Sequence, residues 1–289
     1  MKNISSDIAN FLIQNEQLIN RNNFQQVYKN FDILRLKAGI RYIASYLTEI
    51  FINSGIDFLI HMDRIPDSCF QDLDIKSISI PSSIKIIQDK AFEGCKHLSN
   101  VQLADSIEII YAMAFSDCPQ LRTITLPDSI TLIGSFAFSD CPQLRTITLP
   151  DSITSLGSFA FYNCVNLNQV TIGKNLHKLP ISCFAMCDSL SHIIIPDSIT
   201  SIESGSFSGS GVEELKLPHS LEILSDIVYG CQRLRSIYIP KSCTRIDAHQ
   251  FRSCPKLKDI YFEGSEEEWQ SKIDYNIRKS IKIHFNVKY

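Results

Sequence analysis

The sequence predicts an α/β repeat solenoid with a parallel β-sheet on one face, short strands and turns on the other, and a helical N-terminal cap. Three observations predict this fold. A segment recurs letter for letter 23 residues further along the chain, degenerate copies of it extend over most of the chain, and apolar residues at helical spacing precede the first copy. A fixed period of about 20–50 residues is typical of solenoids, whose stacked units need no single central core.

The repeat is perfect in the middle of the chain, where residues 114–131 and 137–154 both read AFSDCPQLRTITLPDSIT. In this register the first apolar residue of a short strand recurs every 22 or 23 residues, at Ile78, Val101, Ile124, Ile147, Val170, Ile193, Leu215, Ile237 and Ile260. Strand segments at such regular spacing predict a stack of similar coils.

Each copy contains the parts of one coil. An alternating stretch such as Ile124-Thr125-Leu126 is typical of a strand that buries one face. A proline follows it, where the missing N–H does least damage to the strand ladder. A second apolar pair, Ile130 and Ile133 in the same copy, should return the chain across the core, and an Ala-Phe-x-x-Cys segment closes the coil.

Because no single coil can bury its own apolar face, equivalent side chains should form columns inside the stack. One column should hold Phe92, Phe115, Phe138, Phe161, Phe184, Phe207, Val228 and Phe251. A second should hold Cys95, Cys118, Cys141, Cys164, Cys187, Ser210, Cys231 and Cys254. Cysteine is expected there as a small apolar filler with a reduced thiol, although neighbours in the column could stand close enough for a disulfide.

These motifs resemble the leucine-rich repeats of the BspA type, whose pattern is L-x-x-I-x-I-P-x-S-V-x-x-I-G-x-x-A-F-x-x-C. Residues 144–164 match this pattern almost position for position, and the resemblance covers about residues 56–270. Residues 261–269 are also similar to the segment that often closes such arrays. The resemblance implies a leucine-rich-repeat stack in a family of mainly interaction proteins, some of which are surface adhesins that bind host proteins.

Both ends of the predicted solenoid carry segments that could cover its apolar cross-section. Helical spacing before the repeats predicts a capping segment, and a separate partner- or effector-type module is the alternative. Near the other end, Ser265 and Glu268 form a capping-box signature before Trp269, and residues 281–285 alternate like an edge strand. The expected organisation is a helical N-terminal capping segment over 1–55, the repeat solenoid over 56–262 and a C-terminal cap over 263–289.

Composition and motifs argue against several functions. The formal net charge is −3 and no basic block occurs, so no nucleic-acid partner is expected. The ten cysteines include no C-x-x-C pair and the seven histidines no ligand-spaced cluster, so neither a metal nor a cofactor is expected. The chain offers no clustered acid, base and nucleophile, which predicts that it is not an enzyme.

The sequence also bears on where in the cell the protein is found. The first residues lack the apolar core of a signal peptide, and no stretch of about 18 uninterrupted apolar residues could span a membrane. We therefore expect a cytoplasmic monomer, with a cell-surface location reached by a non-standard route as the alternative.

The outward strand positions can vary without disturbing the core, so their pattern indicates where a protein partner would bind. These positions are Ser79, Gln102, Thr125, Thr148, Thr171, Ile194, Lys216, Tyr238 and Tyr261. The change from small polar to larger side chains predicts a partner-binding patch centred on Tyr238 and Tyr261, with Ile194, Lys216 and Arg235 at its edge. Alternatively, such side chains on a strand surface only stack on their neighbours.

Protein–protein recognition by a non-catalytic scaffold, using the exposed face of the repeat sheet, is the function that these observations favour. Adhesin-like binding of host or matrix proteins is the alternative that the resemblance implies. An enzyme with an unrecognised site comes third.

Overall fold

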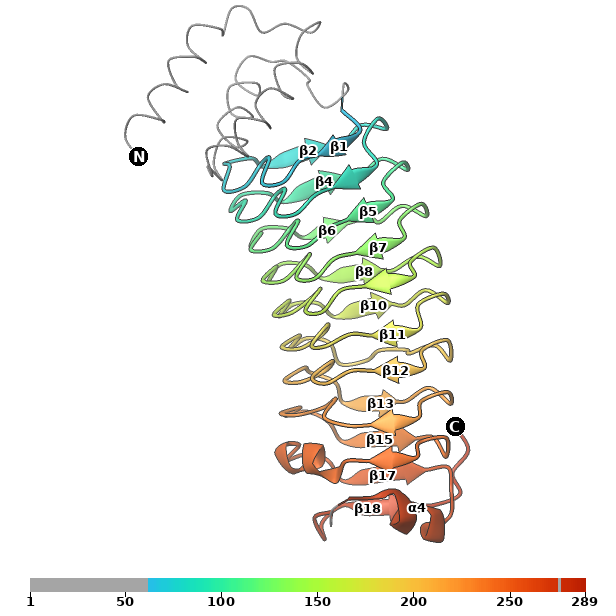
Figure 1. The fold of residues 1–289 in the computed structure, drawn as a ribbon. Helices are drawn as coiled ribbons and strands as arrows, with labels where there is room; N and C mark the ends of the chain where they lie inside the picture. The colour runs from blue at the N-terminus through green and yellow to red at the C-terminus, as the bar shows by residue number, and fades with distance from the viewer. Residues whose placement is uncertain (1–61, 275–276) are drawn as a thin grey trace, which may run out of the picture.

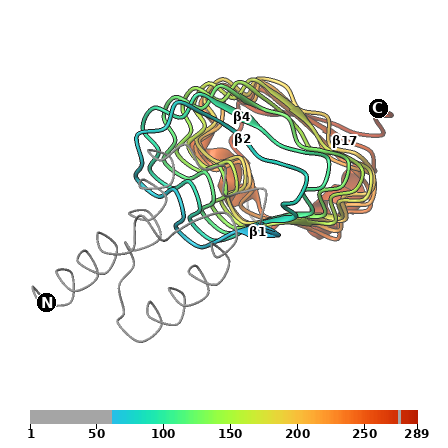
Figure 2. The same cartoon turned by 90° about the horizontal axis from the view of Figure 1, so that it is seen from above.

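Similar coils follow one another along a single axis, which confirms the predicted solenoid (Figure 1). The computed structural model describes residues 62–274 and 277–289. Seen along the axis, successive coils superpose closely (Figure 2), as expected for a repeat of nearly constant length. The helical segment predicted over residues 1–55 lies outside the described residues.

All predicted strand positions except that at Ile193 form parallel strands along one face, which we call the first sheet. Its members are β2 (Ser77–Ser79), β4 (Asn100–Gln102), β6 (Thr123–Ile124), β8 (Thr146–Thr148), β10 (Gln169–Thr171), β13 (Glu214–Lys216), β15 (Ser236–Ile239), β17 (Asp259–Phe262) and β18 (Lys282–His284). Equivalent residues of neighbouring coils lie side by side, as Ile237 does with Ile260. Within each strand the inward residues are more buried than the outward ones, in agreement with the alternating pattern of the sequence.

The second apolar pair of each repeat forms shorter strands on another face, which we call the second sheet. Its members are β1 (Arg64–Ile65), β3 (Ile86–Ile87), β5 (Ile109–Ile110), β7 (Leu132–Ile133), β9 (Ser155–Leu156), β11 (Lys178–Leu179), β12 (Ser201–Ile202), β14 (Ile223–Leu224) and β16 (Arg245–Ile246). Each strand has two residues, and the second of them is buried. The prediction of short strands and turns opposite the main sheet is therefore confirmed.

The α/β class is not confirmed, because the described residues contain little helix and form a parallel-strand β-solenoid. The helical segments among them are the 3-10 helix η2 (Ala248–Ser253) and the α-helix α4 (Glu266–Lys272). The Ala-Phe-x-x-Cys corners before η2 instead contain two left-handed residues each, such as Phe136 and Asp140 with φ of 58° and 56°. A right-handed helix cannot continue through such residues, so the corner turns tightly.

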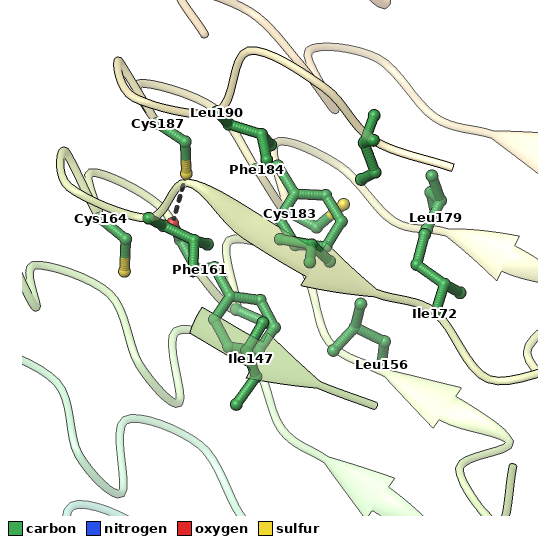
Figure 3. Packing of buried hydrophobic residues seen from close by; sticks show 14 of the residues in the cluster. Ile147, Leu156, Phe161, Cys164, Ile172, Leu179, Cys183, Phe184, Cys187 and Leu190 are labelled. Atoms are coloured by element: carbon green, nitrogen blue, oxygen red, sulfur yellow. Dashed lines mark hydrogen bonds between the residues drawn. The ribbon is translucent and has the colours of Figure 1, made fainter. Parts of the chain in front are cut away.

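The phenylalanine column is confirmed and extends back to Phe70. From Phe70 to Phe207, the phenylalanine rings of successive coils are stacked with centroids 4.8–6.0 Å apart. Figure 3 shows Phe161 and Phe184 one above the other inside the stack. Val228 and Phe251 continue the column with exposed fractions of 0% and 1%. The coils are therefore held together by a continuous apolar core rather than by separate clusters.

The cysteine column forms hydrogen bonds as well as filling space. The Sγ atom of Cys187 lies 3.3 Å from the carbonyl oxygen of Phe161 in the preceding coil (Figure 3), and Cys164 is placed equivalently at 3.1 Å from Phe138. Burial raises the pKa of the Cys95 thiol to about 12. Such a thiol stays protonated and can donate to a carbonyl. All ten cysteines of the chain are buried.

A short helix that starts at a capping box packs over the last coil. The Ser265 hydroxyl accepts a hydrogen bond from the Glu268 N–H at 3.2 Å, and the Glu268 carboxylate accepts one from the Ser265 N–H at 2.7 Å, so the capping box starts α4. Trp269 on this helix is 1% exposed and packs edge-on against Phe262, with ring centroids 5.3 Å apart. The apolar cross-section at this end is thus shielded from water.

Candidate functional site

The first sheet is interrupted where the repeat predicts a strand at Ile193. β10 pairs only with β8 and β13 only with β15, and residues 193–195 form no strand between them. The Glu213 N–H still donates to the Ser191 carbonyl at 3.0 Å, but no backbone hydrogen bond of residues 193–195 occurs in the described part of the chain. The interruption coincides with the change from 23-residue to 22-residue coils.

A lesser interruption separates β6 from β8. The Arg145 N–H still contacts the Arg122 carbonyl there at 3.4 Å, and both coils keep their strands. The coil of residues 193–195 therefore differs in having lost its strand and not only its pairing.

A groove with a cavity volume of about 890 Å³ lies at this interruption, and we call it the sheet groove. Its walls come from residues 168–171, 192–197, 214 and 216–219, together with Tyr289. Ile194 projects outward with 85% of its surface exposed, whereas its neighbours Ile193 and Ile195 are each 8% exposed. The groove thus combines an apolar floor, an exposed apolar side chain and backbone groups that are free to bond.

The five predicted partner-binding residues lie along this face but not in one pocket. Ile194 and Lys216 line the sheet groove. Tyr238 and Tyr261 follow on the same ladder, half-buried and stacked with ring centroids 4.4 Å apart. The Lys216 ammonium lies 5.1 Å from the centre of the Tyr238 ring. Arg235 lies on the flanking ladder, 3.6 Å from the Glu213 carboxylate.

Both faces of the Tyr261 ring are covered by neighbouring rings. It stacks on Tyr238 on one side and on His284 of β18 on the other, the latter with centroids 4.6 Å apart. The ladder therefore presents ring edges and hydroxyls to the outside rather than ring faces. Stacking on neighbours accounts for the position of these tyrosines, and their contact with a partner stays a prediction.

Tyr289 completes the groove from a distant part of the sequence. Its hydroxyl donates to the carbonyl of Leu217 at 3.1 Å, and its ring stacks on His219 with centroids 5.2 Å apart. The two ring nitrogens of His219 lie 3.2 Å from Asp197 and 3.2 Å from Glu263. The hydrogen bond from the His219 backbone N–H also lowers the pKa of the Asp197 carboxyl.

Sequence reasoning missed both Tyr289 and His219 as groove residues. Position 289 follows the last repeat, so no periodicity relates it to the coil of Leu217, 72 residues earlier. His219 follows a strand-ending proline like several other polar residues, and its partners come from other coils. In the sequence, the groove was indicated only by Ile194, an outward isoleucine in the ladder.

The groove has an apolar floor and a charged rim. Within residues 62–274 and 277–289, no group of three or more His, Cys, Asp or Glu side chains is placed to ligate one. The groove joins an apolar floor to a rim of both charges, including Lys216, Glu214 and Asp197. Apolar centres with polar rims are the usual anatomy of protein interfaces.

Comparison with protein families gives a match over nearly all of the described chain. The model of the BspA type leucine-rich repeat region matches residues 63–190 and 177–288, in six copies. A comparison with curated proteins gave no significant match.

Several solved structures are similar. A leucine-rich repeat protein from Bacteroides ovatus shares 24% identity at a TM-score of 0.56, over 78% of this chain and 66% of that chain. The T. pallidum leucine-rich repeat protein shares 30% identity at a TM-score of 0.48, over 50% of this chain and 69% of that one. A leucine-rich cell surface protein from Faecalibacterium prausnitzii shares 23% identity at a TM-score of 0.40, over 70% and 64%. The chain thus spans just under two thirds of the B. ovatus chain, and that likeness supports the solenoid fold.

Proposed function

Because the chain belongs to the BspA-type leucine-rich repeat family, we propose that it is a non-catalytic scaffold that binds a protein partner through the sheet groove. The observation that carries this proposal is the loss of the strand at residues 193–195, which leaves the exposed Ile194 and three residues of unpaired backbone on the first sheet. The stability of a repeat coil does not require the loss of its strand.

The energetics of the groove favour a protein ligand. Ile194 is 85% exposed, and burying such a side chain contributes about 1.5–3 kcal/mol. The N–H and C=O groups of residues 193–195 can bond to the main chain or side chains of a partner without first breaking a sheet bond. Lys216 and Asp197 supply opposite charges at the rim, which would set the orientation of the partner.

We propose that this recognition takes place in the cytoplasm. Among the residues that the structure describes, none belongs to a helix long and apolar enough to cross a membrane. A partner found only among extracellular or host proteins would instead favour the adhesin-like alternative, so both sources belong in the test.

The proposal predicts that Ile194→Asp abolishes partner capture. Wild-type protein, Ile194→Asp and the control Thr148→Asp are immobilised and exposed in parallel to a lysate of the source organism and to extracellular proteins. Both substitutions introduce one negative charge at an exposed position of the same ladder. We expect the partner on wild type and Thr148→Asp, and at least about ten-fold less on Ile194→Asp, equivalent to about 1.4 kcal/mol.

Melting curves separate this result from unfolding. Because both side chains are exposed, each substitution should change the free energy of unfolding by less than about 0.5 kcal/mol. Equal capture by all three proteins would contradict binding at the sheet groove.

A further inference from the structure

The C-terminal end of the sheet groove holds a phenol ring in a well-defined seat. The Tyr289 ring lies between His219 and Tyr238, with centroid distances of 5.2 Å and 5.1 Å. Its hydroxyl donates to the Leu217 carbonyl at 3.1 Å, and that oxygen accepts no other hydrogen bond within the described ranges. Burial raises the pKa of the Tyr289 phenol well above its usual value, so it is present as a neutral donor.

The backbone beside Tyr289 is held much less firmly than its ring. The Asn286 N–H donates to the Gly264 carbonyl at 2.9 Å and the Val287 N–H to the Phe262 carbonyl at 3.2 Å, and no backbone hydrogen bond is made by residues 288–289 in the described structure. Asn286 also has a φ of 56°, a left-handed conformation that costs free energy. A segment with so few backbone bonds can open locally without unfolding the solenoid.

We infer that this end of the groove is a binding subsite for a tyrosine side chain, that Tyr289 occupies it as an internal ligand, and that a partner segment displaces Tyr289 with a tyrosine of its own. The inference rests on the proposed function and adds the chemistry of the partner. Ile194 and Tyr289 line one continuous groove. An extended segment that covers Ile194 therefore reaches the subsite.

The hydrogen bond makes the subsite selective. A phenylalanine ring would fill the same space between His219 and Tyr238 but would leave the Leu217 carbonyl without its donor. A buried polar group that loses its partner weakens binding more than lost area does. The partner's side chain should therefore be tyrosine rather than phenylalanine.

The test uses p-cresol, the side chain of tyrosine as a free molecule, and toluene as its analogue without the hydroxyl. Binding is measured by NMR titration to the full chain as wild type, as Tyr289→Ala and as the control Lys288→Ala, whose side chain is exposed. We expect p-cresol to bind Tyr289→Ala at least about ten-fold more tightly than the other two proteins, and toluene to bind Tyr289→Ala at least about three-fold more weakly than p-cresol does. Equal p-cresol binding by all three proteins, or none by Tyr289→Ala, would overturn the subsite.

Hydrogen exchange of the wild-type protein tests whether Tyr289 can be displaced. The amides of Asn286 and Val287 should exchange at least about a hundred-fold faster than that of Ile237 inside β15, because the segment opens on its own. Exchange of all three at one rate would mean that the segment opens only with global unfolding, which overturns displacement. The two proposals can fail separately. If p-cresol does not bind Tyr289→Ala but Ile194→Asp loses partner capture, the subsite is wrong and the proposed function stands. If p-cresol binds Tyr289→Ala but Ile194→Asp captures the partner fully, the proposed function is wrong and the subsite stands.

Discussion

Replacing Phe138 with alanine is expected to lower the free energy of unfolding by about 3–5 kcal/mol. The ring is fully buried and stacks between Phe115 and Phe161, with both centroid distances 5.4 Å. Coils on either side hold these rings in place, so the space left by the substitution cannot collapse and remains as a cavity. Urea denaturation followed by circular dichroism measures the loss.

Phe136→Ala is the matched control for this prediction. Phe136 lies two residues earlier in the same corner, is only half-buried and has a φ of 58°. It stacks on Phe159 but lies outside the column, so its removal should cost about 1 kcal/mol. Similar losses for the two variants would contradict the claim that the continuous phenylalanine column holds the coils together.

Replacing Trp269 with alanine is expected to cost about 3–5 kcal/mol and to make the protein associate. Trp269 covers the last coil and is 1% exposed, with its ring edge-on to Phe262 at 5.3 Å and to Phe285 at 6.5 Å. A solenoid whose end coil is uncovered presents an apolar cross-section to which another molecule can add. Size-exclusion chromatography with light scattering at increasing concentration measures this association.

The control for Trp269→Ala is Glu267→Ala, which changes an exposed residue of the same helix. It should alter the free energy of unfolding by less than about 0.5 kcal/mol and leave the chain monodisperse. If Trp269→Ala also stays monodisperse and loses less than about 1 kcal/mol, α4 does not act as a cap.

Most of the solenoid could be predicted because its determinants are local and repeat. The 23-residue period predicts the strand ladder except at Ile193, and the same register predicts the positions of Phe138 and Cys141 in their columns. The helix α4 was predictable for the same reason, since Ser265 and Glu268 lie three residues apart in a capping box. The corners were not, because the left-handed conformation at Phe136 belongs to a residue type that rarely adopts it.

The candidate site was predictable only in part, because it depends on contacts between distant segments. Ile194 could be found as an apolar residue on a polar ladder, but the loss of its strand depends on how whole coils stack. Tyr238 and Tyr261 were found by residue type. His284, which stacks on Tyr261, lies one 23-residue period further on in the predicted edge strand, whereas no periodicity relates Tyr289 to Tyr238. Short-range patterns carry no information about such contacts.

Hydrogen exchange of the complex with the captured partner tests binding at the sheet groove most directly. The account predicts that the amides of residues 191–195 and of Lys216, Leu217 and His219 exchange at least about ten-fold more slowly in the complex, while those of β4 and β6 keep their rates. Slowed exchange confined to β4 and β6, or to the second sheet, with unchanged rates at residues 191–195 would contradict it.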